Sequence, residues 1–179
     1  MTKNDIEYLR QYIRNVPDFP VKGIQFKDIS TLVKDAKALH KVSEYLTDYY
    51  KEYGITKVVG IESRGFILGS ILAYKLNAGF VLIRKPGKLP ADTIEEVYEK
   101  EYGFDTIQIH KDALDKDDVV LIHDDLLATG GTSIAACNLI RKTGLKKIYL
   151  NYLVELEELN GRNKIPADIE VMTLLKFDI

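Results

Sequence analysis

The chain has 179 residues, a formal net charge of -2, 46% hydrophobic residues and 29% charged residues. This composition is typical of a globular protein, and the length suits a single domain, residues 1–179. The slight acidic balance argues against a nucleic-acid partner. No apolar stretch approaches the ~20 residues of a membrane-spanning helix, so we expect no membrane partner. The opening residues lack a signal-peptide pattern and the single cysteine, Cys137, cannot form an internal disulfide, so we expect a cytoplasmic protein.

The first 54 residues predict two helices and a loop. Apolar residues recur at helical spacing over residues 5–16, which predicts a helix that Pro17 and Pro20 bring to an end. Residues 19–29 contain turn formers and aromatic residues without a clean period, which predicts an ordered loop. The pattern over residues 36–53 predicts an amphipathic helix that ends at Gly54.

Five apolar runs rich in β-formers follow, at residues 57–61, 79–83, 118–122, 148–153 and 169–175. Their nearly continuous apolarity indicates strands buried on both faces, and helical patterns at residues 66–76 and 132–142 lie between them. The sequence therefore predicts an α/β fold with a mainly parallel, doubly wound sheet. Residues 84–106 are rich in charge, Gly and Pro and lack a core pattern, which predicts a flexible lid loop.

An acidic pair and a glycine turn follow the third apolar run. Asp124 and Asp125 lie where ligands bind in open α/β sheets, beyond the carboxyl end of a strand. Carboxylates there accept hydrogen bonds from a sugar diol or attract a divalent cation. Residues 129–132 open a helix, whose free N–H groups and positive dipole end attract phosphate. The pattern predicts a ribose 5-phosphate site, and the alternative is a capped helix with a solvated acidic turn.

Residues 119–132 resemble the phosphoribosyl diphosphate (PRPP) motif of the type I phosphoribosyltransferases. Segments 19–29, 62–66, 82–90 and 101–103 extend the resemblance to the adenine branch of that family over nearly the whole chain. The resemblance implies a pentosyltransferase of purine salvage, in which adenine and PRPP give AMP and pyrophosphate. It also implies a requirement for Mg²⁺, bound mainly through PRPP rather than by direct protein ligands, and a homodimer.

The resemblance assigns the polar residues to PRPP. Asp124 and Asp125 accept hydrogen bonds from the ribose hydroxyls, and their charge favours an oxocarbenium-like ribose. The 5-phosphate is assigned to Ala128, Thr129, Gly130, Gly131 and Thr132. The leaving pyrophosphate requires cations, which are assigned to Arg64, Arg84, Lys85 and Lys88. The Arg84 position can reach the neighbouring subunit's site in this family. The alternative for these cations is a surface ion pair or a solvated charge.

The resemblance places adenine against Phe26, with Leu126 or Leu127 on the other face of the ring. The backbone at Gln25 and Lys27 would read the base edge and reject 6-oxo purines, which would leave buried polar groups unpaired. Phe26 is alternatively a core residue. Gln25 and Lys27 depart from the family pattern, which has a small apolar residue and an arginine there. These departures affect the base preference only if side chains help to read the base.

Two catalytic roles fall in the expected lid. Glu101 is the candidate that exchanges a proton at adenine N7, and Tyr102 helps to close the site. An ordinary solvated charge run is the alternative for Glu101. Two other functions compete with adenine transfer: a phosphoribosyltransferase for a 6-oxo purine, which residues 23–29 disfavour, and a PRPP-binding regulator. The regulator needs a DNA-binding module, and no basic recognition helix is evident.

Overall fold

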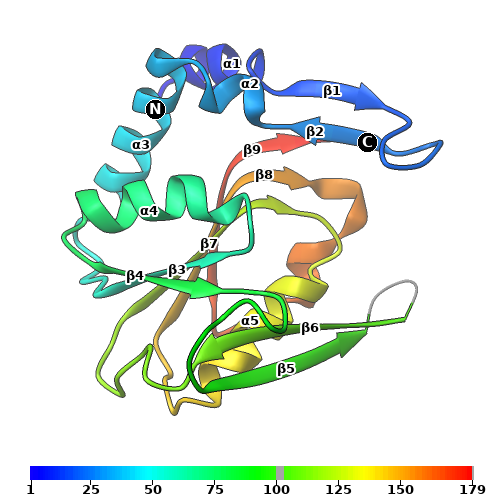
Figure 1. Ribbon diagram of the computed structural model, residues 1–179. Coiled ribbons are helices and arrows are strands. Elements are labelled where there is room, and N and C mark those ends of the chain that lie inside the picture. The colour runs from blue at the N-terminus through cyan, green and yellow to red at the C-terminus, as the bar shows by residue number, and fades with distance from the viewer. Residues whose placement is uncertain (100–102, 179) are drawn as a thin grey trace. The chain divides into compact units, whose positions relative to one another are not determined.

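The computed structural model describes residues 1–99 and 103–178, which form two compact units, Met1–Tyr49 and Tyr50–Asp178. Figure 1 shows the helices and strands of both units along the chain. Among the helices of the described residues, none is long and apolar enough to cross a membrane.

The first unit contains three helices and a two-stranded sheet. Helix α1 (Lys3–Arg10) starts at a capping box, in which Thr2 and Asp5 each accept a hydrogen bond from the other's backbone N–H. Strands β1 (Arg14–Pro17) and β2 (Gln25–Asp28) pair antiparallel, and the short helix α2 (Ser30–Val33) and the long helix α3 (Ala36–Tyr50) follow.

Two predictions for this unit were wrong in part. The predicted helix over residues 5–16 ends at Arg10, because residues 14–17 pair with residues 25–28 instead of continuing the helix. The predicted loop over residues 19–29 contains strand β2 for the same reason. Arg14 and Asp28, which lie opposite each other in the register, form an ion pair that accompanies this pairing. The predicted helix over residues 36–53 was confirmed as α3.

The second unit is built on a five-stranded sheet in the order β4-β3-β7-β8-β9, and every pairing in it is parallel. The strands are β3 (Lys57–Ile61), β4 (Gly79–Ile83), β7 (Val120–Leu127), β8 (Ile148–Leu156) and β9 (Glu170–Phe177). The predicted parallel sheet is therefore confirmed, although the last three strands extend beyond the apolar runs. The acidic pair consequently lies within β7 rather than after it.

Helices α4 (Gly65–Lys75) and α5 (Gly131–Arg141) cover opposite faces of this sheet (Figure 1). On one face, Gly60 of β3 leaves room for the ring of Phe66 of α4. On the other face, the neighbouring residue Val59 belongs to a core cluster with Ala136 and Cys137 of α5. Adjacent strand residues point to opposite faces, so the predicted doubly wound arrangement is confirmed. The short 3-10 helices η1 (Glu157–Leu159) and η2 (Gly161–Lys164) connect β8 to β9.

The predicted lid loop was wrong in part in its secondary structure, because residues 93–99 and 104–106 belong to the strands of a β-hairpin. Strands β5 (Thr93–Glu99) and β6 (Phe104–His110) pair antiparallel from Thr93↔His110 to Glu99↔Phe104. Ile94, Tyr98 and Ile107 face the core of the second unit, whereas Val97 is exposed. This alternation of period two is short and interrupted by glutamates, which explains why the sequence pattern did not reveal it.

Candidate active site

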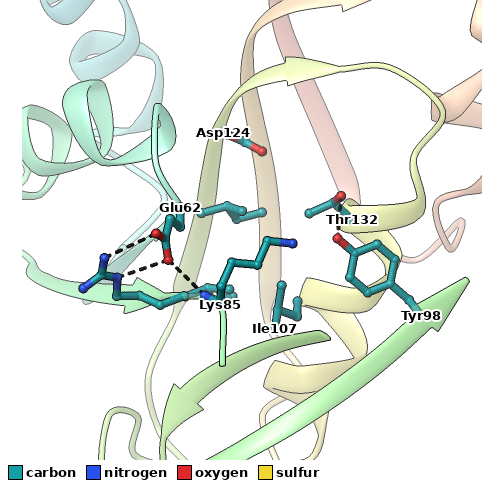
Figure 2. Close-up of a pocket in the computed structure, with 9 residues that line it drawn as sticks. Glu62, Lys85, Tyr98, Ile107, Asp124 and Thr132 are labelled. Carbon is teal, nitrogen blue, oxygen red and sulfur yellow. Dashed lines mark hydrogen bonds and ion pairs between the residues drawn. The ribbon is translucent and has the colours of Figure 1, made fainter. Parts of the chain in front are cut away.

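A pocket of about 140 Å³ opens at the carboxyl ends of β3 and β4 and beside β7, and we call it the strand-end pocket (Figure 2). It is lined by Ile61, Glu62, Ile83, Arg84, Lys85, Tyr98, Ile107, Asp124 and Thr132. Four of the predicted site residues therefore line one cavity: Asp124 of the acidic pair, the cations Arg84 and Lys85, and Thr132 of the glycine turn. The position agrees with the general rule for ligands of open α/β sheets.

The two predicted carboxylates do not line this pocket together. Asp124 lies at the pocket, whereas Asp125 is buried and its Oδ2 lies 2.7 Å from Nε of Arg64. Within the described residues this contact is an ion pair, and Asp125 Oδ2 accepts no hydrogen bond. Adjacent residues of a strand point to opposite faces, which explains the separation.

Burial raises the pKa of Asp124 well above its ordinary value, and the neighbouring charge of Asp125 raises it further. Burial also raises the pKa of Asp125, although the Arg64 guanidinium opposes this shift. Within the protein, Asp124 Oδ1 accepts a hydrogen bond from the backbone N–H of Asp125 at 2.9 Å. An ionised pair in these surroundings is stabilised by further hydrogen-bond donors or positive charge, which a bound ligand can supply.

We call residues 128–132 the phosphate loop. Gly130 caps helix α5 in the left-handed conformation, with φ of 83°, and has no side chain that could bond to the N-terminus of the helix. The N–H groups of the first helical turn therefore have no intrahelical partner and are available to an anion. Thr132 places its hydroxyl at the strand-end pocket. The structure thus supports the geometry that the glycine turn predicted.

Glu62 binds groups from three of the four predicted cationic residues through one carboxylate, and Figure 2 shows it beside Lys85. It accepts from Nε and Nη2 of Arg84 at 3.2 and 3.3 Å and from the backbone N–H of Lys85 at 2.9 Å, and Nζ of Lys88 lies 3.3 Å away. Burial raises the pKa of Glu62, but the hydrogen bonds from Lys85, Arg84 and Lys88 outweigh it and lower the pKa to about 2. The family resemblance implies that the turn of residues 62–65 contacts the pyrophosphate, but it does not predict that the Glu62 carboxylate binds the cations.

Gly65 allows the turn before α4 to approach strand β7. A Cβ at this position would lie 2.7 Å from the carbonyl oxygen of His123 and 3.1 Å from Oδ1 of Asp124. A backbone oxygen cannot move aside as a side chain does, so a larger residue would displace the turn. Gly65 therefore brings Arg64 beside Asp125.

The β5–β6 hairpin supplies side chains to the pocket that the sequence analysis missed. The hydroxyl of Tyr98 donates to Asp105 Oδ2 at 3.2 Å and shares a hydrogen bond with the Thr132 hydroxyl at 3.2 Å. Lys85 pairs through Nζ with Asp105 rather than with Glu62. The alternation of Ile94, Glu96 and Tyr98 on one strand face is the signal that could have placed Tyr98 on the inner side.

Three of the four residues predicted to bind the base, Gln25, Phe26 and Lys27, lie in the first unit, on β2. Phe26 makes an edge-to-face contact with Phe19, with ring centroids 5.1 Å apart. Asn15 donates to Gln25 Oε1 at 2.7 Å and accepts from Nζ of Lys27 at 3.0 Å, so both side chains are tied to β1. Leu126 lies on β7 in the second unit and is partly buried. The catalytic candidates Glu101 and Tyr102 lie outside the described residues.

Comparisons with known proteins show similarity along the whole chain. Residues 28–172 match the family model described as the phosphoribosyl transferase domain. The chain is 60% identical over 169 residues to the adenine phosphoribosyltransferase of Bacteroides thetaiotaomicron, which covers 94% of this chain and 96% of that relative. The crystal structure of adenine phosphoribosyltransferase from Rhodothermus marinus has a TM-score of 0.94 and 49% identity, covering 98% of this chain and 100% of that one. The Giardia lamblia enzyme in complex with 9-deazaadenine has a TM-score of 0.92 and 45% identity, covering 97% and 98%.

Proposed function

The chain belongs to the adenine phosphoribosyltransferase family, and from that premise we propose that it transfers the 5-phosphoribosyl group of PRPP to adenine, giving AMP and pyrophosphate. It is an enzyme of the pentosyltransferase class that serves purine salvage. The observation that carries the proposal is the strand-end pocket, in which Asp124 meets Thr132 of the phosphate loop and two of the predicted cations, Arg84 and Lys85. The family model spans residues of both units, so we treat residues 1–179 as a single functional domain.

Asp124 and the phosphate loop bind the phosphoribosyl group in this proposal. The Asp124 carboxylate accepts hydrogen bonds from the ribose hydroxyls, which favours its charged form against the effect of burial. As the bond from C1 to pyrophosphate breaks, the positive charge that develops on the ribose is stabilised by the same carboxylate. Asp125 acts by holding Arg64 near the pocket and by completing the acidic pair. The N–H groups of the first turn of α5 bind the 5-phosphate.

Arg64, Arg84, Lys85 and Lys88 balance the charge of the pyrophosphate. Arg84 and Lys88 are already oriented by Glu62, so little ordering is required when the anion binds. Two carboxylates line the pocket among the described residues, and Glu62 is already bound to these cations. Asp124 is then the one carboxylate there that could bind a metal ion, so Mg²⁺ would take most of its oxygen ligands from PRPP. When bound, Mg²⁺ neutralises charge that accumulates on the leaving pyrophosphate.

Phe26 and the backbone of β2 bind adenine in this proposal. Gln25 and Lys27 lie two residues apart, so their backbone N–H and C=O groups point to the same side of the strand. Their side chains are bonded to Asn15, which supports recognition of the base by backbone atoms. The complex of the Giardia lamblia relative with 9-deazaadenine supports a purine as the ligand. Glu101 exchanges the proton at adenine N7, and Tyr102 helps to close the site.

The proposal includes a cytoplasmic homodimer. Helix α4 is mostly apolar, and its residues Ile67 and Tyr74 are exposed. Strand β4, which follows α4 in the chain and forms an edge of the sheet, also has an exposed apolar residue, Leu82. A helix of this kind is normally covered on all sides, and a second copy of the chain would cover it. The absence of an internal disulfide is consistent with the cytoplasm, and the one cysteine, Cys137, is fully buried.

The test is pyrophosphate release with PRPP and Mg²⁺, comparing adenine with hypoxanthine and guanine. We expect turnover with adenine alone, and a loss of at least about 100-fold in kcat for Asp124→Asn. Asp117→Asn, at an exposed position before β7, is the matched control and should retain wild-type turnover. Turnover with only a 6-oxo purine would contradict the base assignment. PRPP binding without turnover on any base would favour the regulator.

A further inference from the structure

The turn between β8 and β9 lies directly against the phosphate loop, backbone to backbone. A Cβ at Gly161 would overlap the carbonyl oxygen of Ala128 and lie 2.8 Å from the nitrogen of Gly130. In the other direction, a Cβ at Gly130 would lie 2.6 Å from the carbonyl oxygen of Gly161. These neighbours are main-chain atoms, so no side chain can rotate away to make space. Both positions thus require glycine for the two segments to touch.

Arg162, the next residue, ties this turn to the sheet. Its Nε and Nη2 donate to the two carboxylate oxygens of Glu155 at 2.9 and 2.7 Å, and Nη1 donates to the carbonyl oxygen of Val171 at 2.8 Å. Nη2 also donates to the hydroxyl of Thr173 at 2.9 Å, which in turn donates to Glu155 at 2.7 Å. Glu155 is buried, and a two-pronged pair of this kind fixes orientation as well as distance. The guanidinium therefore joins β8, β9 and the turn.

The middle of the phosphate loop consists of two consecutive glycines, Gly130 and Gly131, and Gly130 as the N-cap has no side chain to bond to the helix that follows. At the end of the loop, the Thr132 hydroxyl shares a hydrogen bond with Tyr98, which leaves residues 128–130 to be held through their backbone. Glycine loses more conformational freedom on ordering than any other residue, so an unsupported loop of this kind would weaken anion binding. Binding is tightest when the N–H groups are held in place before the ligand arrives.

We propose that Gly161, Arg162 and Glu155 form a brace that positions the phosphate loop and thereby sets the affinity for the 5-phosphate. The three are positioning residues, since they act through the backbone of residues 128–130. The inference rests on the proposed role of that loop in phosphoribosyl binding. The three residues lie in a segment outside every motif of the sequence analysis.

The experiment measures dissociation constants by titration calorimetry for two separate ligands, ribose 5-phosphate and pyrophosphate with Mg²⁺. For Gly161→Ala we expect the Kd of ribose 5-phosphate to rise at least about tenfold, because the added Cβ displaces the loop. The Kd of pyrophosphate should stay within about twofold, because its proposed cations lie elsewhere in the pocket. Arg162→Lys keeps the charge but loses the two-pronged geometry, and it should raise only the first constant, by a smaller factor.

Gly69→Ala is the matched control, because its Cβ would lie 3.0 Å from the Phe80 ring, in α4 and away from the loop. It should lower the melting temperature without changing the ratio of the two constants. Unchanged ribose 5-phosphate binding in Gly161→Ala and Arg162→Lys would overturn the brace, as would an equal rise for both ligands. If Gly161→Ala does not fold, Arg162→Lys alone decides between these outcomes. Failure of the wild type to bind ribose 5-phosphate would instead refute the proposed function of the loop.

Discussion

At the scale of single residues, Asp124 combines a useful chemistry with a cost in stability. Its carboxylate is held in surroundings that favour the protonated form, because burial and the charge of Asp125 both raise its pKa. A catalytic group in such surroundings gives up folding free energy when it ionises at neutral pH. The substrate hydroxyls and the developing positive charge would return part of that energy during the reaction.

Asp124→Asn should therefore make the protein more stable while it removes activity. The folded-state pKa of Asp124 lies above its unfolded value, so the penalty is absent at a pH below about 4 and grows as the pH rises through the folded-state pKa. We expect the amide to raise the free energy of unfolding at pH 8 and to raise it less at pH 4. Urea denaturation at the two pH values measures this difference. An equal effect at both would contradict the assigned cause.

The sequence predicted the residues of the glycine turn and the cations because their types and spacing are informative by themselves. Glu62 and Gly161 were not predicted, since their roles depend on neighbours that the fold brings together. Glu62 follows β3 and binds Arg84 and Lys88, which follow β4. Gly161 contacts the backbone of residue 128, from which it is separated in sequence by helix α5 and strand β8. Asp125 shows the opposite case, because adjacency in sequence suggested a shared role that strand geometry separates.

At the scale of elements, Glu62 joins the segment after β3 to the segment after β4. The carboxylate binds the side chains of Arg84 and Lys88 and the backbone of Lys85, so the two segments form one rigid edge of the strand-end pocket. Most of its side chain is withdrawn from solvent, with 14% exposed, so these interactions are less screened than those of a surface pair.

Glu62→Gln should loosen this edge in a manner that depends on pH. The pKa of Glu62 is lowered to about 2 from an ordinary value of 4.5, so its contribution to stability is full above pH 4.5 and is lost as the pH falls towards 2. We expect a loss on the order of 2 kcal/mol at pH 7 that shrinks at pH 3. Glu157→Gln, which removes an exposed pair with Lys176, should change stability little at either pH. Thermal unfolding of both variants at the two pH values makes the comparison, and equal losses would count against the clamp.

The sequence pattern predicted the strands of the parallel sheet, but it did not predict the strands of the two-stranded sheets, which are half exposed. All five strands of the parallel sheet matched apolar runs, because burial on both faces requires nearly every residue to be apolar. Strands β1, β2, β5 and β6 belong to two-stranded sheets with one face exposed. Their short alternation is masked by charged residues and prolines, which also suggested a helix over residues 14–16 and a loop over residues 93–99.

At the scale of the whole molecule, the proposed dimer depends on the uncovered side of α4. Tyr74 is 87% exposed, so replacing it by aspartate should not disturb the fold of one chain. We expect sedimentation equilibrium to give twice the chain mass of 20.3 kDa for the wild type and a shift towards monomer for Tyr74→Asp. Phe104→Asp, at an exposed apolar position on the hairpin, should remain dimeric. A monomeric wild type would contradict the proposal.

The contact of Gly161 with residues 128–130 also bears on how the protein emerges from the ribosome. The phosphate loop is synthesised well before Glu155, Arg162 and Thr173, the residues that tie its support to the sheet. When the whole PRPP motif has left the ribosome, the nascent chain thus still lacks the residues that hold the phosphate loop in position. Tight capture of a sugar phosphate would begin only when the last two strands have docked, late in synthesis. Shortening the chain from its C-terminus would then abolish ligand binding while leaving every residue of that motif in place.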